Sequence, residues 1–391
     1  MRIKPLFYLA VFTLLGDLSS RAQSDPLSSW TPRNLTLTNN GLNAIVYGNN
    51  EFVAVGTSGA VLTSPDGSTW TAQTTGAHGD LTGVAYGNTL FAAVGMDGSI
   101  LTSPDGVMWT ERLSSSNLLL AVTYGNGQFV AVGENNMFGG AILTSPDGIA
   151  WTSRVSASDV RLSSVAYGKN LFVATGGKSN SGEIVTSSNG IDWSLATVLP
   201  SDNSFVGAVY GNGLFLAGLS PGPGFLTSSN GTDWVFDSLQ SVVPLGGGID
   251  NANAFGDGYF AVVGHGLIAT TPDGLAWSNR LAGPIASMDP DLLGIVFGNG
   301  TFVAVGVAGT VLQSGVLQEQ PVLGPLVILP GGGSQITLTG QAGVTYPVQI
   351  STDLLRWTSL TNFALTGSSG SFIDLSASGS ARRFYRVSSQ P

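Results

Sequence analysis

A seven-residue motif, Ser-Pro-Asp-Gly-x-x-Trp, recurs through most of this chain and constrains its fold more than any other feature. The first copy spans residues 64–70. Further copies or close variants span residues 103–109, 145–151, 187–193, 228–234 and 271–277. Repetition with a period of about 40 residues is typical of proteins that repeat one small structural unit. The repeat is therefore the basis for predicting the fold.

Each repeat predicts four short β-strands. Apolar runs such as residues 52–55 and 60–63 end at Gly, Asn, Asp or Pro, which is typical of strands bounded by turns. Asn49-Asn50 and its Asn-Gly counterparts suit a tight turn between the first two strands, because both residue types tolerate positive φ. Pro-Asp-Gly suits the turn between the third and fourth strands. No segment after the N-terminus has the spacing of an amphipathic helix, so we predict an all-β chain.

Two repeated aromatic signals predict how the repeats close into a ring. An aromatic-Gly pair occurs seven times, at Tyr47, Tyr86, Tyr124, Tyr167, Tyr210, Phe255 and Phe297. The series of repeated Trp residues is shifted by one repeat relative to these pairs. Trp30 precedes the first pair, and no repeated Trp follows the last pair. Four strands per period of about 40 residues are typical of a β-propeller. We therefore predict a seven-bladed β-propeller over residues 23–320, closed by the N-terminal strand at Trp30.

The repeated motif also resembles a known family. Ser-x-Asp-Gly-x-x-Trp is similar to the Asp-box of the sialidase-type (BNR) repeat, whose usual form has one more residue between Asp and Gly. The shorter form is similar to repeats in secreted bacterial propellers and in the photosystem II assembly factor family. In that family the box is a structural turn away from the active site. The resemblance implies structural roles for Asp66, Asp105, Asp147, Asp273, Trp70, Trp109, Trp151, Trp193, Trp234 and Trp277.

The two ends of the chain differ from the repeats. Residues 1–22 are typical of a secretory signal peptide, with Arg2 and Lys4 before an apolar run and Ser20-Arg21-Ala22 as a cleavage site. We therefore predict a secreted protein, extracellular or periplasmic. The absence of cysteine excludes disulfides and thiolate metal sites, and it fits a bacterial secreted protein.

Residues 321–391 predict a linker and a small β-sandwich, because they contain short alternating strands. The segment is similar to C-terminal modules of secreted bacterial proteins at residues 346–357 and 383–387, and its Tyr-Arg-Val ending resembles fibronectin type III domains. Ser351, Asp353 and Trp357 repeat the spacing of the box without its Gly.

Composition limits the function. The formal charge is −10, so the chain lacks the positively charged surface that nucleic-acid binding requires. No segment after the signal peptide is predicted to enter a membrane. A sialidase-type site needs a cluster of arginines, but only Arg161 lies in a variable loop. The sequence therefore favours a non-enzymatic protein without deciding the question.

Variation between repeats indicates a recognition face. The turns after the first and third strands barely change, whereas the other loops vary freely, and variable loops on a repeated scaffold commonly carry recognition. We predict a monomer that binds a polysaccharide or an extracellular or envelope protein, with the 134–140 loop as the main contact. The candidate binding residues are Glu134, Asn135, Asn136, Phe138, Arg161, Lys178, Asn180 and His265.

Two other functions remain open: a carbohydrate-active hydrolase or lyase using loop acids such as Glu134 and Asp202, and a structural or assembly role in the cell envelope. Calcium is the natural metal for oxygen-rich loops. Its candidate ligands are Asp250, Asp257, Asp289 and Asp291, although their spacing matches no recognised calcium loop. The sequence therefore indicates either no cofactor or a calcium ion.

Overall fold

The computed structural model describes residues 25–33, 39–178, 181–199, 204–220, 224–238, 248–281, 291–317, 321–330, 333–340, 344–377 and 382–387. Contacts divide the chain into a larger unit, Asp25–Val316, and a smaller unit that includes Leu317–Pro391. Both units are built from strands, with single turns of 3-10 helix such as η1 (Pro26–Ser28). None of the helices described is long and apolar enough to cross a membrane.

The described part of the larger unit contains seven four-stranded antiparallel sheets, numbered 1 to 7 here in chain order of their first strands. Sheets 1 to 3 comprise β2 (Leu42–Gly48), β3 (Glu51–Gly56), β4 (Val61–Ser64) and β5 (Thr71–Gln73); β6 (Leu81–Gly87), β7 (Leu90–Gly95), β8 (Ser99–Ser103) and β9 (Thr110–Ser114); and β10 (Leu118–Gly125), β11 (Gln128–Glu134), β12 (Gly140–Ser145) and β13 (Thr152–Arg154). Sheets 4 to 6 comprise β14 (Leu162–Gly168), β15 (Leu171–Lys178), β16 (Ser181–Ser187) and β17 (Ser194–Leu199); β18 (Ser204–Gly211), β19 (Leu214–Ser220), β20 (Gly224–Ser228) and β21 (Val235–Ser238); and β22 (Gly248–Gly256), β23 (Tyr259–His265), β24 (Leu267–Thr271) and β25 (Ser278–Asn279). Each of these six sheets is one run of the chain, as the four-strand repeat predicts.

Sheet 7 joins the two ends of the larger unit. It contains β26 (Leu292–Gly298), β27 (Thr301–Gly306), β28 (Val311–Ser314) and the N-terminal strand β1 (Trp30–Pro32). Strand β1 pairs antiparallel with β28, so that Trp30 lies opposite Ser314. The Arg33 side chain extends the pairing, because its Nε donates to Gln313 Oε1 at 2.8 Å. The N-terminal strand therefore supplies the fourth strand that the last repeat lacks.

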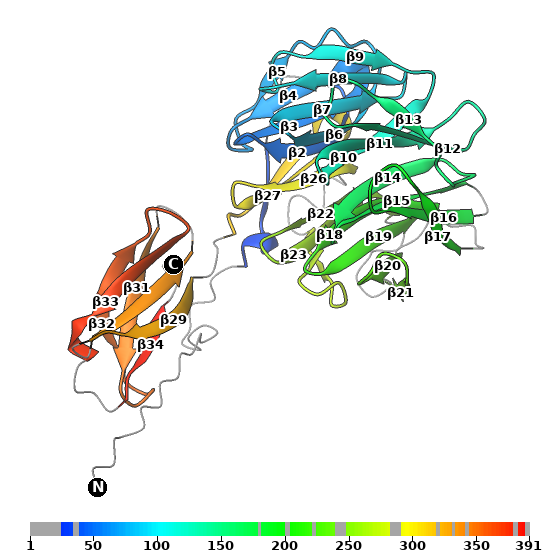
Figure 1. The fold of residues 1–391 in the computed structure, drawn as a ribbon. Coiled ribbons are helices and arrows are strands. Elements are labelled where there is room, and N and C mark those ends of the chain that lie inside the picture. The colour runs from blue at the N-terminus through cyan, green and yellow to red at the C-terminus, as the bar shows by residue number, and fades with distance from the viewer. Residues whose placement is uncertain are drawn as a thin grey trace. The chain divides into compact units, whose positions relative to one another are not determined.

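Glycine allows the first strands of neighbouring sheets to pack closely. A Cβ atom added to Gly48 would lie only 2.1 Å from Cγ of Tyr86 in sheet 2. The same contact recurs between Gly87 and Tyr124, Gly125 and Tyr167, Gly168 and Tyr210, Gly211 and Phe255, Gly256 and Phe297, and Gly298 and Tyr47. The last contact returns to sheet 1, and Figure 1 shows β26, in yellow, beside β2, in blue. The aromatic-Gly pair is thus the contact that links each sheet to the next.

Apolar side chains fill the space between adjacent sheets. One cluster combines Leu42, Ile45 and Phe52 of sheet 1 with Val303 and Val305 of sheet 7. Each repeat places a Phe or Tyr of its first strand against a Phe of its second, as in Tyr47 and Phe52, whose ring centroids are 4.6 Å apart. Such burial supplies most of the free energy that stabilises a fold.

The smaller unit contains two three-stranded antiparallel sheets in its described part. One sheet has the order β29 (Val322–Ile328), β30 (Ser334–Thr339) and β33 (Ser369–Asp374), and the other has the order β32 (Thr358–Ala364), β31 (Thr345–Ser351) and β34 (Phe384–Val387). A single apolar cluster includes Ile336 and Phe372 from the first sheet and Tyr346 and Tyr385 from the second.

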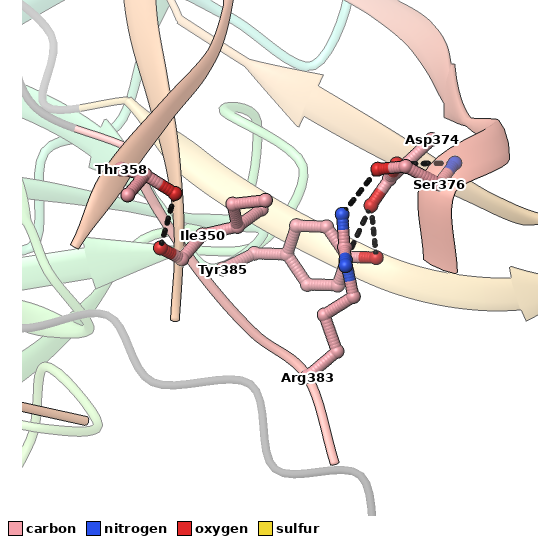
Figure 2. Close-up of polar contacts among 6 residues, drawn as sticks. All are labelled: Ile350, Thr358, Asp374, Ser376, Arg383 and Tyr385. Atoms are coloured by element: carbon pink, nitrogen blue, oxygen red, sulfur yellow. Dashed lines mark hydrogen bonds and ion pairs between the residues drawn. The ribbon is translucent and has the colours of Figure 1, made fainter. Parts of the chain in front are cut away.

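A buried carboxylate ties these two sheets together, as Figure 2 shows. Asp374 at the end of β33 is only 2% exposed. Its Oδ2 accepts from Tyr385 Oη at 2.9 Å and from Arg383 Nε at 2.7 Å, and its Oδ1 accepts from the Ser376 backbone N–H. Burial alone would raise the pKa of Asp374, but the hydrogen bonds from Ser376, Tyr385 and Arg383 outweigh it and hold the pKa below its ordinary value. The Arg-Phe-Tyr-Arg-Val ending therefore has a structural role.

We expect Gly168→Ala to destabilise the larger unit strongly. The new Cβ would overlap Tyr210, and overpacking of this kind costs about 1–3 kcal/mol or more. The free energy of unfolding in urea tests this. Gly41→Ala is the matched control, because its Cβ would meet only ordinary contacts, the nearest at 3.7 Å. Equal stability of the two variants would contradict the packing role of the pair.

Candidate functional site

The larger unit encloses a cavity of about 520 Å³. Residues of all seven first strands line it. One wall position recurs in every sheet and is held by Ile45, Val84, Val122, Val165, Ala208, Asn253 and Ile295. The cavity therefore lies where the seven sheets meet, and six of these seven wall positions are aliphatic.

Variable loops form the rim of this cavity. Asp80 and Arg161, which directly precede first strands, line it, and so do Thr57 and Met96, which follow second strands. None of the described lining residues belongs to a box or to the turn between the first two strands. The sequence-variable side of the repeats is thus the side that meets the cavity.

Most polar groups of the cavity wall are already used to join neighbouring sheets. Asn43 Nδ2 donates to the Leu81 carbonyl and Thr82 Oγ1 to the Leu119 carbonyl, each at 2.8 Å. Ser163 Oγ donates in the same way to the Phe205 carbonyl. At the rim, Asp80 Oδ1 accepts from the Ser58 backbone N–H at 2.8 Å. Within the described residues, the Arg161 guanidinium contacts no carboxylate, and it is the cation of the cavity lining.

The 134–140 loop holds two apolar side chains in water. Asn135 organises the loop, because its Oδ1 accepts from the backbone N–H groups of Met137 and Gly139. The Phe138 N–H donates to the Asn135 carbonyl at 2.9 Å. Met137 is 87% exposed and Phe138 76%. Phe138 also has a φ of 63°, which is uncommon for a bulky residue and stores strain. The loop is therefore a fixed apolar tip.

The remaining loop residues are dispersed. Glu134 ends β11 opposite Gly140, and Asn136 is exposed at the tip of the loop. Lys178 ends β15, where its Nζ donates to the Asp159 carbonyl at 3.2 Å. His265 ends β23 and forms an isolated β-bridge with Asp291. Of the predicted binding residues, only Arg161 lines the cavity, and Asn180 lies outside the described residues.

Of the predicted calcium ligands, the structure describes the side chains of Asp257 and Asp291 only. Asp257 lies in the turn after β22, at the opposite end of that strand from the position of Asp250. Asp291 directly precedes β26, and Asp289 lies outside the described residues. Among the residues that the structure describes, no group of three or more His, Cys, Asp or Glu side chains could hold a metal ion.

The box residues form one turn that is repeated almost atom for atom. In the first copy, Asp66 Oδ1 accepts from the backbone N–H groups of Ser68 and Thr69, each at 2.8 Å. Ser64 Oγ accepts from the Gly67 N–H, and Trp70 Nε1 donates to the Gly67 carbonyl. Gly67 has a φ of 75°, which glycine adopts without strain. In this copy the Ser, Asp and Trp side chains are thus all hydrogen-bonded within the turn, whereas in the last copy Trp277 Nε1 has no hydrogen-bond partner among the described residues.

Two boxes keep this geometry with Asn in place of Asp. Asn189 Oδ1 accepts from the Ile191 and Asp192 N–H groups, as the carboxylate does elsewhere. The extra Asn189 Nδ2 donates to Asp192 Oδ2 at 2.9 Å. Asn230 makes the same bond with Asp233 at 2.8 Å. These two turns therefore still contain a carboxylate, but it belongs to Asp192 and Asp233, three residues after the Asn.

The boxes also contact other sheets. Asn126 Nδ2 of sheet 3 donates to the Ser188 carbonyl of sheet 4, and Asn212 Nδ2 of sheet 5 donates to the Pro272 carbonyl of sheet 6. Gln313 Nε2 of sheet 7 donates to the Asp66 carbonyl of sheet 1 at 2.8 Å. The two invariant turns thus join neighbouring sheets on the side of the repeats away from the cavity rim.

The smaller unit contains the same turn in altered form. Asp353 Oδ1 accepts from the Leu355 and Arg356 N–H groups, and the Leu354 N–H donates to Ser351 Oγ at 2.8 Å. Leu354 occupies the glycine position with a φ of 64°. Trp357 carries the Arg386 guanidinium 4.5 Å above its ring. The spacing in the sequence therefore identified this turn even without its Gly.

No protein-family model matches the chain, and no curated protein matches it. Several solved structures have a similar fold. YCF48 bound to D1 peptide is 17% identical, the similarity covers 75% of this chain and 98% of that one, and the TM-score is 0.59. An inactive virginiamycin B lyase from Staphylococcus aureus, solved with quinupristin, is 13% identical over 74% of this chain and 99% of that one, with a TM-score of 0.63.

The WD40 β-propeller domain of Doa1 is 12% identical over 73% of this chain and 96% of that one, with a TM-score of 0.55. Identities this low show the fold alone. The chain is therefore an all-β protein with a β-propeller fold.

We expect Asn189→Asp to destabilise its turn. The substitution would place a carboxylate oxygen where Nδ2 now donates to Asp192, and two like charges about 4 Å apart repel by about 1 kcal/mol in water. The loss in free energy of unfolding should shrink at high salt. The double variant Asn189→Asp/Asp192→Ala should recover the parent stability. A salt-independent loss that Asp192→Ala does not relieve would show that the turn needs the amide itself.

We also expect the boxes to make stability depend on acid. Backbone N–H groups hold the pKa of Asp105, Asp147 and Asp273 below the ordinary value. Their contribution is therefore complete at neutral pH and is lost as the pH falls below about 4. The triple variant carrying Asp→Asn at these positions should lose less stability than the parent between about pH 4 and pH 2. Glu111→Gln on β9 is the surface-charge control, and it should follow the parent.

Proposed function

We propose that this chain is an exported, non-enzymatic binding module, a seven-bladed β-propeller closed by its N-terminal strand and followed by a small β-sandwich. It recognises a protein segment or a polysaccharide through the variable loops and the cavity that they border. The observation that carries this proposal is the cavity of about 520 Å³ at the meeting point of seven sheets. Concave, mostly apolar cavities with a few polar groups are the usual form of a ligand site.

The 134–140 loop supports recognition by contact rather than by chemistry. An exposed Phe held by a network centred on Asn135 offers a large apolar area with little conformational entropy to lose on binding. Glu134 is also equivalent in the repeat to Thr57 and Met96, which line the cavity. Loop and cavity can therefore act on one extended ligand, each adding affinity to the other.

One comparison favours a protein segment over a polysaccharide as the ligand. YCF48, whose fold is similar, is described with a bound peptide. That likeness concerns the fold, but it is consistent with the use of this scaffold to hold a polypeptide segment during envelope assembly. The alternative of a carbohydrate-active hydrolase or lyase depends on loop acids such as Glu134 and Asp202, and Asp202 lies outside the described residues.

Array binding by the purified chain, with and without calcium, tests the proposal. We expect saturable capture of peptides or polysaccharides without release of sugars into the supernatant. Phe138→Ser should weaken capture about tenfold or more, because it removes an exposed anchor of the kind that dominates interface energetics. Met108→Ser is the matched control, since Met108 is 71% exposed in a box turn, on the side of the repeats away from the cavity rim, and should leave capture unchanged. Released sugars would support the hydrolase instead, and calcium-dependent capture would support the proposed ion.

A further inference from the structure

One residue in the wall of the cavity departs from the pattern of the repeat. Six of the seven equivalent wall positions carry Ile, Val or Ala, and the position in sheet 6 carries Asn253. Repeats within one chain provide an internal comparison, because the same backbone position has the same surroundings in each sheet. A polar residue at this position therefore requires a cause of its own.

Among the residues that the structure describes, the Asn253 carboxamide has no hydrogen-bond partner. Neither Nδ2 nor Oδ1 makes a hydrogen bond, and both atoms are shielded from solvent. Asn253 lies opposite Val262 in the strand pair β22–β23, and Val262 belongs to the apolar cluster between sheets 5 and 6. At equivalent positions, Ile45 and Val122 complete such clusters by packing against the preceding sheet.

An orphaned amide in an apolar layer costs stability in the unbound protein. Folded proteins leave few buried polar groups unpaired, and those that remain often mark a functional site. Valine at this position would remove the polar amide and is already used in sheets 2, 3 and 4. The sequence therefore keeps a group that destabilises the empty cavity, as expected when the group is needed by an occupied one.

We propose that Asn253 is a recognition residue of the cavity and that its ligand is an extended peptide segment, whose backbone amide satisfies the carboxamide. This inference rests on the proposed binding function. A carboxamide offers a donor at Nδ2 and an acceptor at Oδ1, which complement the C=O and N–H of one peptide group. The side chain gains both bonds by turning from the wall into the cavity.

The rest of the wall favours a peptide over a sugar. The lining is mixed, but its polar Asn43, Thr82 and Ser163 side chains are already hydrogen-bonded to neighbouring sheets. The surface left for the ligand includes aliphatic side chains such as Val84 and Val122. Sugar hydroxyl groups placed against such a surface would lose their water without gaining partners. A peptide with small aliphatic side chains loses few polar contacts there and buries apolar area instead.

The first test needs no ligand. Asn253→Val should raise the thermal unfolding midpoint of the chain by roughly 2–8 °C, because it removes two unsatisfied polar atoms. The mirror variant Val122→Asn creates the same defect in sheet 3 and should lower the midpoint by a similar amount. A lower midpoint for Asn253→Val would show that the amide is satisfied, and it would overturn the inference.

The second test uses defined probes with the purified chain. An acetylated, amidated Val-Ala-Val-Ala-Val peptide should bind saturably in calorimetric titrations. Asn253→Val should weaken its binding roughly 10- to 100-fold, as expected for loss of both bonds to a buried amide. A depsipeptide in which the central amide is an ester should bind the parent weakly, and Asn253→Val should weaken it little further. If the effects of the ester and of Asn253→Val on the free energy of binding do not add, Asn253 contacts the central amide of the peptide.

Three outcomes would overturn the inference. They are equal peptide binding by parent and Asn253→Val, no saturable binding of the peptide, and Asn253-dependent binding of tri-N-acetylchitotriose in its place. The proposed function is judged separately by array capture. Capture that survives Asn253→Val would remove the role of Asn253 and leave the binding module, whereas a parent chain that captures nothing would remove the module itself.

Discussion

The contact between a glycine and the aromatic ring of the next sheet is the constraint on which the larger unit depends. Cβ atoms at these seven glycines would lie within 2.0–2.2 Å of a ring carbon, so no other residue permits the approach. Each ring in turn packs on a Phe of its own sheet, as Tyr167 does on Phe172. Because the series ends where it began, at Gly298 and Tyr47, the contact fixes the spacing of the sheets and hence the width of the cavity that they enclose.

The invariant turns act on the same ring from its other side. Boxes and first turns exchange hydrogen bonds between sheets, and Gln313 extends the exchange from sheet 7 to sheet 1. With the Asn43, Thr82 and Ser163 bonds near the cavity, neighbouring sheets are joined at both ends of their first strands. The variable loops therefore contribute less to joining the sheets, which lets them differ in length and composition without loss of the fold.

The fold could be predicted from the sequence because the same turn motifs and aromatic-Gly pair recur in every repeat. The turn role of the box followed from Asn189 and Asn230, and the pairing of β1 with β28 followed from the offset of Trp30. Sites were harder to predict. Asp250 and Asp257 are close in sequence, but they lie toward opposite ends of β22, and a strand rises about 3.3 Å per residue, so the two positions can lie up to about 23 Å apart. Proximity along a β-chain therefore says little about proximity in space.

Asn253 shows what the sequence held but loop variability could not reveal. The predicted site residues lie in loops, where residues vary, whereas Asn253 lies in a strand, where the signal is one deviation from a repeated position. The deviation is visible two residues before the aromatic of the aromatic-Gly pair, where the other six repeats have Ile, Val or Ala. The structure adds that this residue lines the cavity and that its amide atoms, shielded from solvent, have no hydrogen-bond partner among the described residues. In a repeat protein, residues that follow the repeated pattern stabilise the packing of the sheets. A residue that departs from the pattern in the cavity wall and lowers stability is therefore a good candidate for a functional residue.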